Sequence, residues 1–442
     1  MIRISLGVFL LGALFSAHAS EDPAGWVSTS PRPEIMPEAW SRGAVGEERT
    51  LHMKSDNREG LHGVWEKTFP VEGGRYYQWS CERTLKGEAI PRRSAMVKIS
   101  WMGGNGGSVS YEGPVTEGYF RNNHTIARPD YPADVEIDRE KGVARIAGVY
   151  RAPSGATGAK VELHFRWTRN ATIVWKDMEW KQVAAPPSRK VKLATVHLQP
   201  RGGSPGKNNQ LYEPLVVEAA RKGADLVVLG ETISVYGTRL TYAEAAESVP
   251  GPTTDYFGKL ADRHDLYIVA GLVERDGNVL YNVGVLLGPE GEIVGKYRKT
   301  CLPRSEADGG IMPGHEYPVF ETRFGRVGIM ICYDAFFPEV ARQLSANGAE
   351  VIALPVWGCN PSLAAARACE NHVYVVSSTY TDHRDNWIKT GVFDHQGKLI
   401  AQADDWGQVV MAEVDLNQPT VWRGLGDFKA RIERGRPVWT IE

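Results

Sequence analysis

The second half of this chain alternates apolar runs with helical patterns, and that alternation limits its fold more than any other feature. The runs Val191–His197 and Val327–Ile331 are rich in β-branched residues and predict buried strands. Between them, Gln210–Lys222 and Thr254–His264 have the spacing of amphipathic helices. Strands that alternate with helices predict an α/β fold, in which helices cover the faces of sheets.

The composition is that of an ordinary globular protein. Its 442 residues suggest two or three domains, and 42% hydrophobic with 24% charged residues supply ample material for a core. The formal net charge of −2 shows no basic excess. We therefore expect neither nucleic acid nor an anionic membrane surface as the main partner.

The first residues have the pattern of a secretory signal peptide. Met1-Ile-Arg3 is a short positive segment, Ile4–Phe15 is apolar, and Ala17-His-Ala19 offers small residues for cleavage before Ser20. The apolar run is too short to span a bilayer. We predict a signal peptide over residues 1–19, cleavage near Ala19, and export to the periplasm or the extracellular space.

The cysteines do not form a recognisable framework. Their number, five, is low and odd for an exported chain, so at least one thiol stays unpaired in the monomer. No CxxC pair is present, which argues against a zinc site. They are Cys81, Cys301, Cys332, Cys359 and Cys369.

The first half of the chain has a different pattern. Residues 20–62 are rich in Pro, Ser and charge and predict a loose lead-in segment. Over residues 63–183, short runs with period-two alternation, such as Lys160–Trp167 and Thr172–Trp180, predict an all-β sandwich. The proline-rich residues 184–190 predict a linker, so the α/β domain covers residues 191–442.

Several phrases of the β region resemble jelly-roll carbohydrate-binding modules. They are Trp65-Glu-Lys-Thr-Phe-Pro-Val71, Gly74-Arg-Tyr-Tyr77 and Arg92-Arg-Ser-Ala95. The resemblance implies a polysaccharide as a candidate partner, with exposed aromatic rings stacked on sugars. The alternative is that these aromatic side chains fill the core between two sheets.

Three polar residues of the α/β region lie where an apolar strand ends: Glu231, Lys299 and Cys332. Ligands of α/β folds bind at the carboxyl ends of strands, so we expect these side chains to share a pocket. Taken singly, each has an ordinary alternative: a solvated or N-capping carboxylate, a surface ammonium and a packed thiol. Together they allow Glu231 to deprotonate Cys332, while Lys299 lowers the thiol pKa and stabilises an oxyanion.

The contexts of these residues resemble the carbon–nitrogen hydrolase (nitrilase) superfamily. They are Leu-Gly-Glu231-Thr, Lys-Tyr-Arg-Lys299-Thr-Cys-Leu-Pro and Gly-Ile-Met-Ile-Cys332-Tyr-Asp-Ala-Phe-Phe-Pro-Glu. The resemblance implies a four-layer αββα sandwich, a Glu–Lys–Cys triad, no metal or organic cofactor, and a homodimer or higher homo-oligomer. It also implies that Glu306 positions substrate and that the Tyr333 backbone N–H binds the oxyanion. Many members have His where this chain has Cys301, a position outside the triad.

The residues after the thiol resemble the amidase and N-carbamoyl amidohydrolase branches, because Tyr333 and Asp334 follow Cys332 and precede Phe337-Pro-Glu339. We predict an exported hydrolase that cleaves a linear amide or N-carbamoyl C–N bond through a Cys332 thioester. Two alternatives stay open. One is nitrile hydrolysis, and the other is a carbohydrate-binding protein whose hydrolase domain is inactive.

Overall fold

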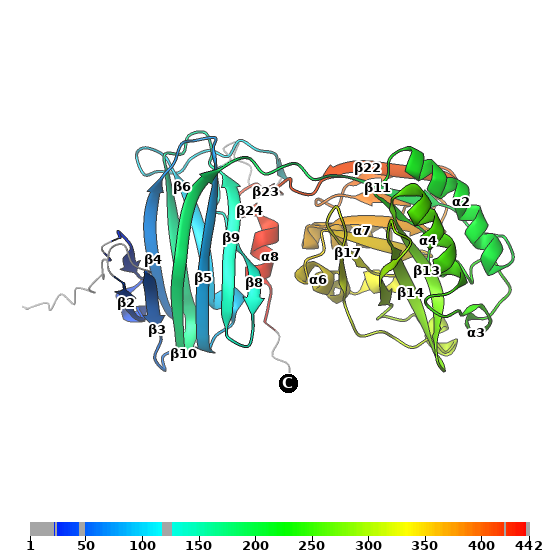
Figure 1. The fold of residues 1–442 in the computed structure, drawn as a ribbon, viewed down its shortest axis with the longest axis horizontal. Coiled ribbons are helices and arrows are strands. Elements are labelled where there is room, and N and C mark those ends of the chain that lie inside the picture. Colours follow the sequence, from blue (N-terminus) through cyan, green and yellow to red (C-terminus); the bar gives the residue numbers. More distant parts are fainter. Residues whose placement is uncertain (1–21, 23, 44–48, 117–125, 420, 439–442) are drawn as a thin grey trace, which may run out of the picture. The chain divides into compact units, whose positions relative to one another are not determined.

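The computed structural model describes residue 22 and residues 24–43, 49–116, 126–419 and 421–438 of the chain. It divides into two compact units. The first consists of Met1–Pro186 and Val421–Glu442, and the second consists of Pro187–Thr420 (Figure 1). The predicted signal peptide, residues 1–19, lies outside the described residues.

The first unit is built mainly of antiparallel strands. Its elements before the second unit are β1 (Val27–Thr29), η1 (Pro33–Ile35), β2 (Glu38–Arg42), β3 (Thr50–Lys54), β4 (Leu61–Pro70), β5 (Tyr76–Glu88), α1 (Pro91–Ser94), β6 (Ala95–Met102), β7 (Val115–Thr116), β8 (Ala133–Asp138), β9 (Val143–Arg151) and β10 (Gly158–Val183).

Strand β10 joins the sheets of this unit. The sequence predicted two strands here, but Gly158–Val183 is one continuous strand. Its first half pairs with β4 and β6, and its second half pairs with β3 and β5. Between the halves, Trp167 and Asn170 have positive φ angles of 56° and 50°. Such bends let a strand pass from one sheet to another.

One aromatic core serves both parts of the unit. Trp65, Trp79 and Trp175 are fully buried in it, on strands β4, β5 and β10. These rings therefore fill the interior, which was the alternative that the sequence left open for the region's aromatic residues. The jelly-roll connectivity stays a prediction.

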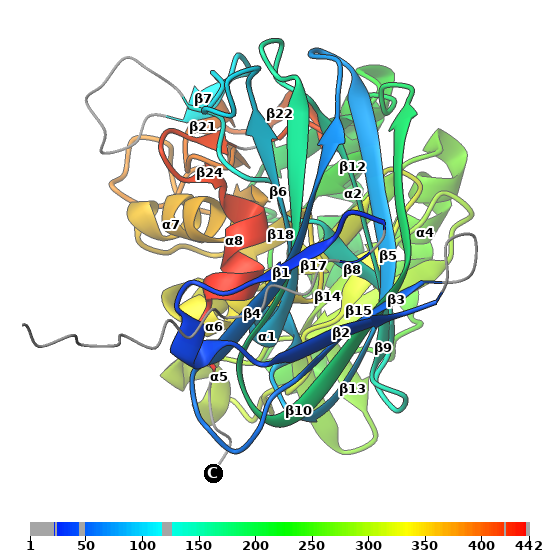
Figure 2. The same cartoon turned by 90° about the vertical axis from the view of Figure 1, so that its left-hand side faces the viewer.

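Two segments differ from the sequence-based expectation. The described part of residues 20–62 is not a loose lead-in, because β1 pairs with β4 and β3 pairs with β2 and β10; Figure 2 shows β2 and β3 side by side in dark blue.

The sequence also placed residues 421–442 in the α/β domain. The structure groups the described part of this segment, residues 421–438, with the first unit, where β23 (Val421–Trp422) pairs with β7 and with β24 (Gly426–Asp427). Helix α8 (Phe428–Gly435) follows. The Arg92 guanidinium donates a hydrogen bond of 2.9 Å to the carbonyl oxygen of Glu433 in this helix.

The second unit contains strands alternating with helices, as predicted. Its elements are β11 (Lys190–His197), α2 (Pro205–Arg221), β12 (Leu226–Val228), α3 (Tyr242–Ala245), α4 (Pro252–His264), β13 (Tyr267–Asp276), β14 (Val279–Leu287), β15 (Ile293–Arg298), α5 (Arg304–Asp308), β16 (Val319–Glu321), β17 (Arg326–Ile329), η2 (Cys332–Phe336), α6 (Pro338–Ala346), β18 (Val351–Val356), α7 (Pro361–Asn371), β19 (Tyr374–Thr379), β20 (Gly391–Phe393), β21 (Leu399–Gln402) and β22 (Gln408–Asp415).

These elements form four layers. The strand orders of the two sheets are β15-β14-β13-β12-β11-β22 and β16-β17-β18-β19-β20-β21. Along β12, Leu226 and Val228 face the core shared with the second sheet, whereas Val227 faces the core beneath α2 and α4. Helices α6 and α7 cover the other sheet (Figure 1). The αββα sandwich that the sequence predicted is therefore confirmed for this unit.

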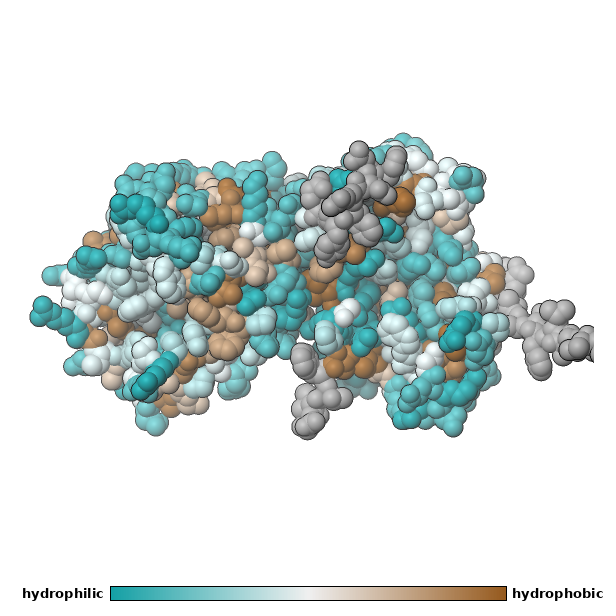
Figure 3. Space-filling model, turned by 180° about the vertical axis from the view of Figure 1, so that it is seen from behind, coloured by the Kyte–Doolittle hydropathy of each residue, from teal (hydrophilic) through white to brown (hydrophobic). Residues whose placement is uncertain are grey.

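On the face drawn in Figure 3, hydrophilic and hydrophobic residues are interspersed. Within the described ranges, no helix is both long enough and apolar enough to cross a membrane.

The first unit contains a carboxyl group whose titration should affect stability. Burial raises the pKa of Asp130 from 3.8 to about 7; a hydrogen bond from Trp101 lowers this pKa, and the charge of Asp427 raises it. Between these two pH values the unfolded chain loses the Asp130 proton while the folded chain keeps it. The free energy of unfolding should therefore fall as pH rises through this window, and level off above about pH 7.

We expect Asp130→Asn to remove this contribution. Calorimetric melting of the full chain should show the variant gaining stability over the wild type between pH 4 and pH 8, with its Asn still accepting the Trp101 hydrogen bond. Asp177→Asn, an exposed matched change, should show no such trend. Parallel pH profiles for the wild type and Asp130→Asn would contradict the assignment.

Candidate active site

Turns that follow three strands of the second unit carry the predicted residues. Glu231 follows β12, Lys299 directly follows β15, and Cys332 begins η2 after β17. The first two come from one sheet and the third comes from the other. Because the two sheets pack face to face, their strand ends bring these turns into one buried region.

Lys299 lies at the centre of this region. Its side chain is fully buried, and its Nζ donates to Glu231 Oε1 at 2.9 Å and to Glu306 Oε1 at 2.5 Å. Burial would lower the pKa of Lys299, but the negative charges of Glu231 and Glu306 raise it above its usual value. The ammonium therefore stays charged and fixes both carboxylates, as a buried charge requires partners.

Cys332 lies next to this ion cluster. Its Sγ is 3.8 Å from the carbonyl oxygen of Gly358, and the N–H of the preceding residue, Trp357, donates to Glu231 Oε2 at 2.9 Å. The φ angle of Cys332 is 45°, a conformation that non-glycine residues rarely adopt. Such strain is stored at functional turns, where the surrounding structure holds the residue in place.

The thiol is protonated in the resting protein. Burial raises the pKa of Cys332 well above its usual value, the charge of Glu231 raises it further, and Lys299 lowers it. The sequence analysis predicted the sign of the Lys299 effect correctly, but burial outweighs it. A nucleophilic thiolate therefore requires a base, and Glu231 is the carboxylate whose charge acts most strongly on this sulfur.

Asp334 ties the Cys332 turn to the Lys299 turn. This fully buried carboxylate accepts hydrogen bonds from Ile331 N at 2.8 Å and Tyr297 Oη at 2.8 Å. It also accepts from Thr300 Oγ1 at 3.2 Å and Cys301 N at 2.9 Å. Ile331 directly precedes the thiol, while the other three donors belong to β15 and the residues after Lys299, so one side chain fixes the two turns relative to each other.

Two further side chains support Glu231, and the sequence analysis missed both. Asn282 Nδ2 donates to Glu231 Oε1 at 2.9 Å and to Glu306 Oε2 at 3.2 Å. The Tyr380 hydroxyl donates to the carbonyl oxygen of Glu231 at 2.7 Å. A signal for Asn282 exists in the sequence, since an amide within the apolar strand Tyr281–Leu287 needs buried partners.

The remaining predicted residues lie around this cluster. Tyr333 is the second residue of η2, where backbone N–H groups have no partner inside the helix and can bind an anion. Burial raises the pKa of Glu306, with the Lys299 charge lowering it. Cys301 is partly buried beside Asp334, and burial raises its pKa to about 11.

In the parts of the chain that the structure describes, no group of three or more His, Cys, Asp or Glu side chains is arranged to hold a metal ion. The arrangement offers a thiol, a carboxylate able to accept its proton, a fixed ammonium and helix N–H groups. These are the components of nucleophilic acyl transfer.

Known proteins resemble the part of the chain that carries this site. The profile of the family described as Carbon-nitrogen hydrolase matches residues 192–424. A nitrilase of Pyrococcus abyssi is 43% identical over 238 residues, covering 51% of this chain and 90% of that protein. The omega-amidase NIT2 of Xenopus tropicalis is 34% identical over 262 residues, covering 54% and 94%. Among solved structures, an amidase from Nesterenkonia sp. is 18% identical, with a TM-score of 0.46 over 53% of this chain and 93% of its own.

The position of Asp334 can be tested by Asp334→Asn. Because the Asn amide presents N–H groups to donors that the carboxylate satisfied, the variant should lose about 2 kcal/mol of unfolding free energy. Thermal melting of the full chain measures this loss, and Asp404→Asn, an exposed aspartate of the same unit, serves as the control. Equal melting temperatures for the two variants would contradict the role of Asp334 in fixing the Cys332 turn relative to the Lys299 turn.

Proposed function

Because the chain belongs to the carbon–nitrogen hydrolase family, we propose that it hydrolyses a non-peptide C–N bond of a linear amide or N-carbamoyl compound. One observation carries the proposal: the Lys299 ammonium is buried between Glu231 and Glu306, beside the turn that presents Cys332. These residue types supply a base, an electrostatic stabiliser and a nucleophile for one reaction.

The first half-reaction forms a thioester. Glu231 accepts the Cys332 proton as sulfur attacks the carbonyl carbon, and negative charge develops on the carbonyl oxygen. Lys299 and the Tyr333 N–H stabilise that oxygen. As the C–N bond breaks, Glu231 returns the proton to the departing nitrogen, which leaves as ammonia or an amine.

The second half-reaction releases the acid. Glu231 removes a proton from water, the hydroxide attacks the thioester carbon, and the C–S bond breaks. The proton passes to the Cys332 sulfur, which restores the resting thiol. The raised pKa of Cys332 favours this return, since the free thiol is the stable form between turnovers.

Nitrile hydrolysis is the second candidate reaction at this site. It is supported by the 43% identity to the Pyrococcus abyssi nitrilase, whereas the amide proposal is supported by the omega-amidase relatives. Both reactions begin with attack by the same thiol. The residues Tyr333 and Asp334 after Cys332 favour the amide reaction, because they resemble the amidase branch.

Ammonia release from matched amides, N-carbamoyl compounds and nitriles tests the proposal. We expect turnover of amides or carbamoyl compounds, and a loss of about a thousand-fold or more for Cys332→Ala, because the nucleophile is removed. Cys369→Ala is the matched control, a partly buried cysteine on α7. Turnover of nitriles alone would contradict the amide assignment, and activity that survives Cys332→Ala would contradict the mechanism.

We also propose that the protein is exported and acts as a homodimer or higher homo-oligomer. Export is supported by the charged, apolar and small-residue pattern of residues 1–19. The oligomer is an expectation from the family resemblance.

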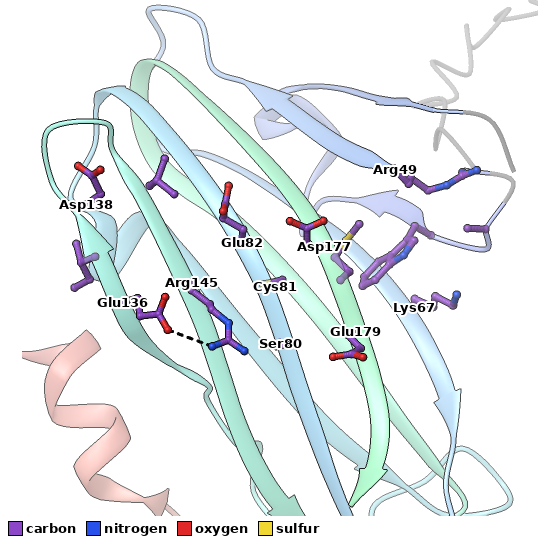
Figure 4. Close-up of a pocket in the computed structure, with 15 residues that line it drawn as sticks. Arg49, Lys67, Ser80, Cys81, Glu82, Glu136, Asp138, Arg145, Asp177 and Glu179 are labelled. Atoms are coloured by element: carbon purple, nitrogen blue, oxygen red, sulfur yellow. Dashed lines mark hydrogen bonds and ion pairs between the residues drawn. The ribbon is translucent and has the colours of Figure 1, made fainter. Parts of the chain in front are cut away.

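A polysaccharide is the proposed partner of the first unit. The observation that favours it is an open cavity of about 980 Å³ on the face formed by β4, β5, β8, β9 and β10 (Figure 4). Charged side chains able to hydrogen-bond with sugar hydroxyls line it: Glu82, Glu136, Asp138, Asp177, Glu179, Arg49, Lys67 and Arg145. Trp26 also lines it but is only 3% exposed, so hydrogen bonds rather than ring stacking would hold a sugar there.

Affinity electrophoresis of the full chain through gels containing soluble polysaccharides tests this binding. We expect at least one polysaccharide to retard the wild type, and the double change Asp177→Ala with Glu179→Ala to remove the retardation. Trp167→Ala, which alters an exposed ring outside the cavity, should leave it unchanged. Loss with Trp167→Ala alone, or no retardation by any polysaccharide, would contradict the assignment of the cavity.

A further inference from the structure

Trp167 has an unusual backbone conformation at the bend of β10. Arg166 and Thr168 pair with consecutive residues of β4, so Trp167 between them is the extra residue of a β-bulge. Its φ angle is 56°, a value that bulky side chains rarely adopt. Bulges often turn a side chain toward a functional site, and backbone strain is retained where the surroundings hold the residue for a purpose.

The bulge presents the Trp167 ring at the surface together with two cations. Of the tryptophans that the structure describes in the first unit, Trp167 alone is exposed, with 51% of its surface accessible. The guanidinium carbons of Arg166 and Arg93 lie over this ring, 3.9 Å and 5.3 Å from its centroid. The indole therefore holds two cations at one place by cation–π contacts.

A hydrogen bond also joins the two arginines. Arg166 Nε, on β10, donates to the carbonyl oxygen of Arg93, on α1, at 3.1 Å. The Nε of Arg93 is buried and has no hydrogen-bond partner. Both side chains are half-buried, and a guanidinium that lies against a ring keeps the N–H groups on its edge available. The two arginines can thus offer several donors to one ligand.

These two cations lack a carboxylate partner. Within the described ranges, neither Arg93 nor Arg166 forms an ion pair, since their contacts are the Trp167 ring and a backbone carbonyl oxygen. Arg169, further along the same strand, differs from them: it pairs with Glu88 at 3.0 Å and with Glu59 at 3.7 Å. An exposed arginine of β10 is therefore neutralised, whereas the two at the Trp167 ring are not.

A third cation adds to this positive charge. Burial lowers the pKa of Arg166, and the charges of Arg93 and Arg434 lower it further. Arg434, on α8, lies over the Tyr131 ring at 5.2 Å, and its guanidinium donates to two backbone carbonyl oxygens rather than to a carboxylate. Like charges repel each other, so this grouping favours the binding of an anion.

From these contacts we propose that Arg93, Arg166 and Trp167 form a binding site for a phosphate monoester. Such a group carries a charge of about −1.5 to −2 near pH 7, which matches two guanidinium groups, whereas a carboxylate carries a single negative charge. The planar guanidinium fork also fits phosphate oxygens with paired hydrogen bonds. The site lies in the first unit and uses no residue of the candidate active site, so it is independent of the proposed hydrolysis.

Calorimetric titration of the full chain with phenyl phosphate and with benzoate tests this proposal, because the two ligands share a ring and differ in charge. We expect phenyl phosphate to bind about ten-fold more tightly, and its affinity to fall as the salt concentration rises. Arg93→Gln and Arg166→Gln should each weaken this binding by about ten-fold or more. Arg169→Gln, which removes an arginine already paired with carboxylates, should leave it unchanged.

Two further variants keep the test independent of folding and of the hydrolase site. Arg166→Lys keeps the charge but loses the planar fork, so its affinity for phenyl phosphate should lie between those of the wild type and Arg166→Gln. Cys332→Ala should bind phenyl phosphate as the wild type does, and a loss of binding in this variant would place the phosphate at the active site instead. Thermal melting shows that each variant is folded.

Cosedimentation with phosphatidylcholine vesicles, with and without phosphatidic acid, identifies the source of the phosphate. Binding both to phenyl phosphate and to the vesicles that contain phosphatidic acid would assign it to a lipid headgroup, and binding to phenyl phosphate without binding to vesicles would assign it to a soluble ester. Equal affinity for phenyl phosphate and benzoate, no binding of phenyl phosphate, or unchanged affinity in both Gln variants would overturn the site.

Discussion

The buried contact of Lys299 with two carboxylates is the interaction on which the active site depends. A lone charge in this interior would cost several kcal/mol, and removing one partner of such a set leaves the others uncompensated. Lys299 therefore holds Glu231 and Glu306 in place as much as it prepares them for chemistry. Asn282 donates hydrogen bonds to the same two carboxylates, so Lys299 and Asn282 together fix the separation between them.

This ion cluster functions only if the thiol stays beside it, and Asp334 provides that link. Its carboxylate receives donors from the residue before Cys332 and from the segment around Lys299. The positive φ angle of Cys332 is maintained by this arrangement, because a strained residue persists where its surroundings determine its conformation. The burial that makes these contacts strong also raises the pKa of the thiol, which is why the mechanism needs Glu231 as a base.

The fold of the second unit was predictable because the spacing of apolar residues along the sequence differs between its strands and its helices. In the first unit the period-two pattern predicted strands correctly, but it could not show that Lys160–Trp167 and Thr172–Trp180 belong to one strand. Continuity through Trp167 and Asn170 depends on two sheets that pair with different halves of β10, and such pairing is not a local property. The same reason explains the placement of residues 421–438, because β23 at the start of this segment pairs with β7, which lies far away in sequence.

The sequence by itself determined the α/β alternation and the three strand-end residues Glu231, Lys299 and Cys332, because periodicity and residue type are local and can be recognised without a fold. Only the tertiary structure decided what surrounds them. Asn282 and Asp334 acquire their roles from hydrogen bonds between distant turns. The net direction of the Cys332 pKa shift was likewise decided in three dimensions, since burial depends on the packed sheets and exceeds the opposing charge of Lys299.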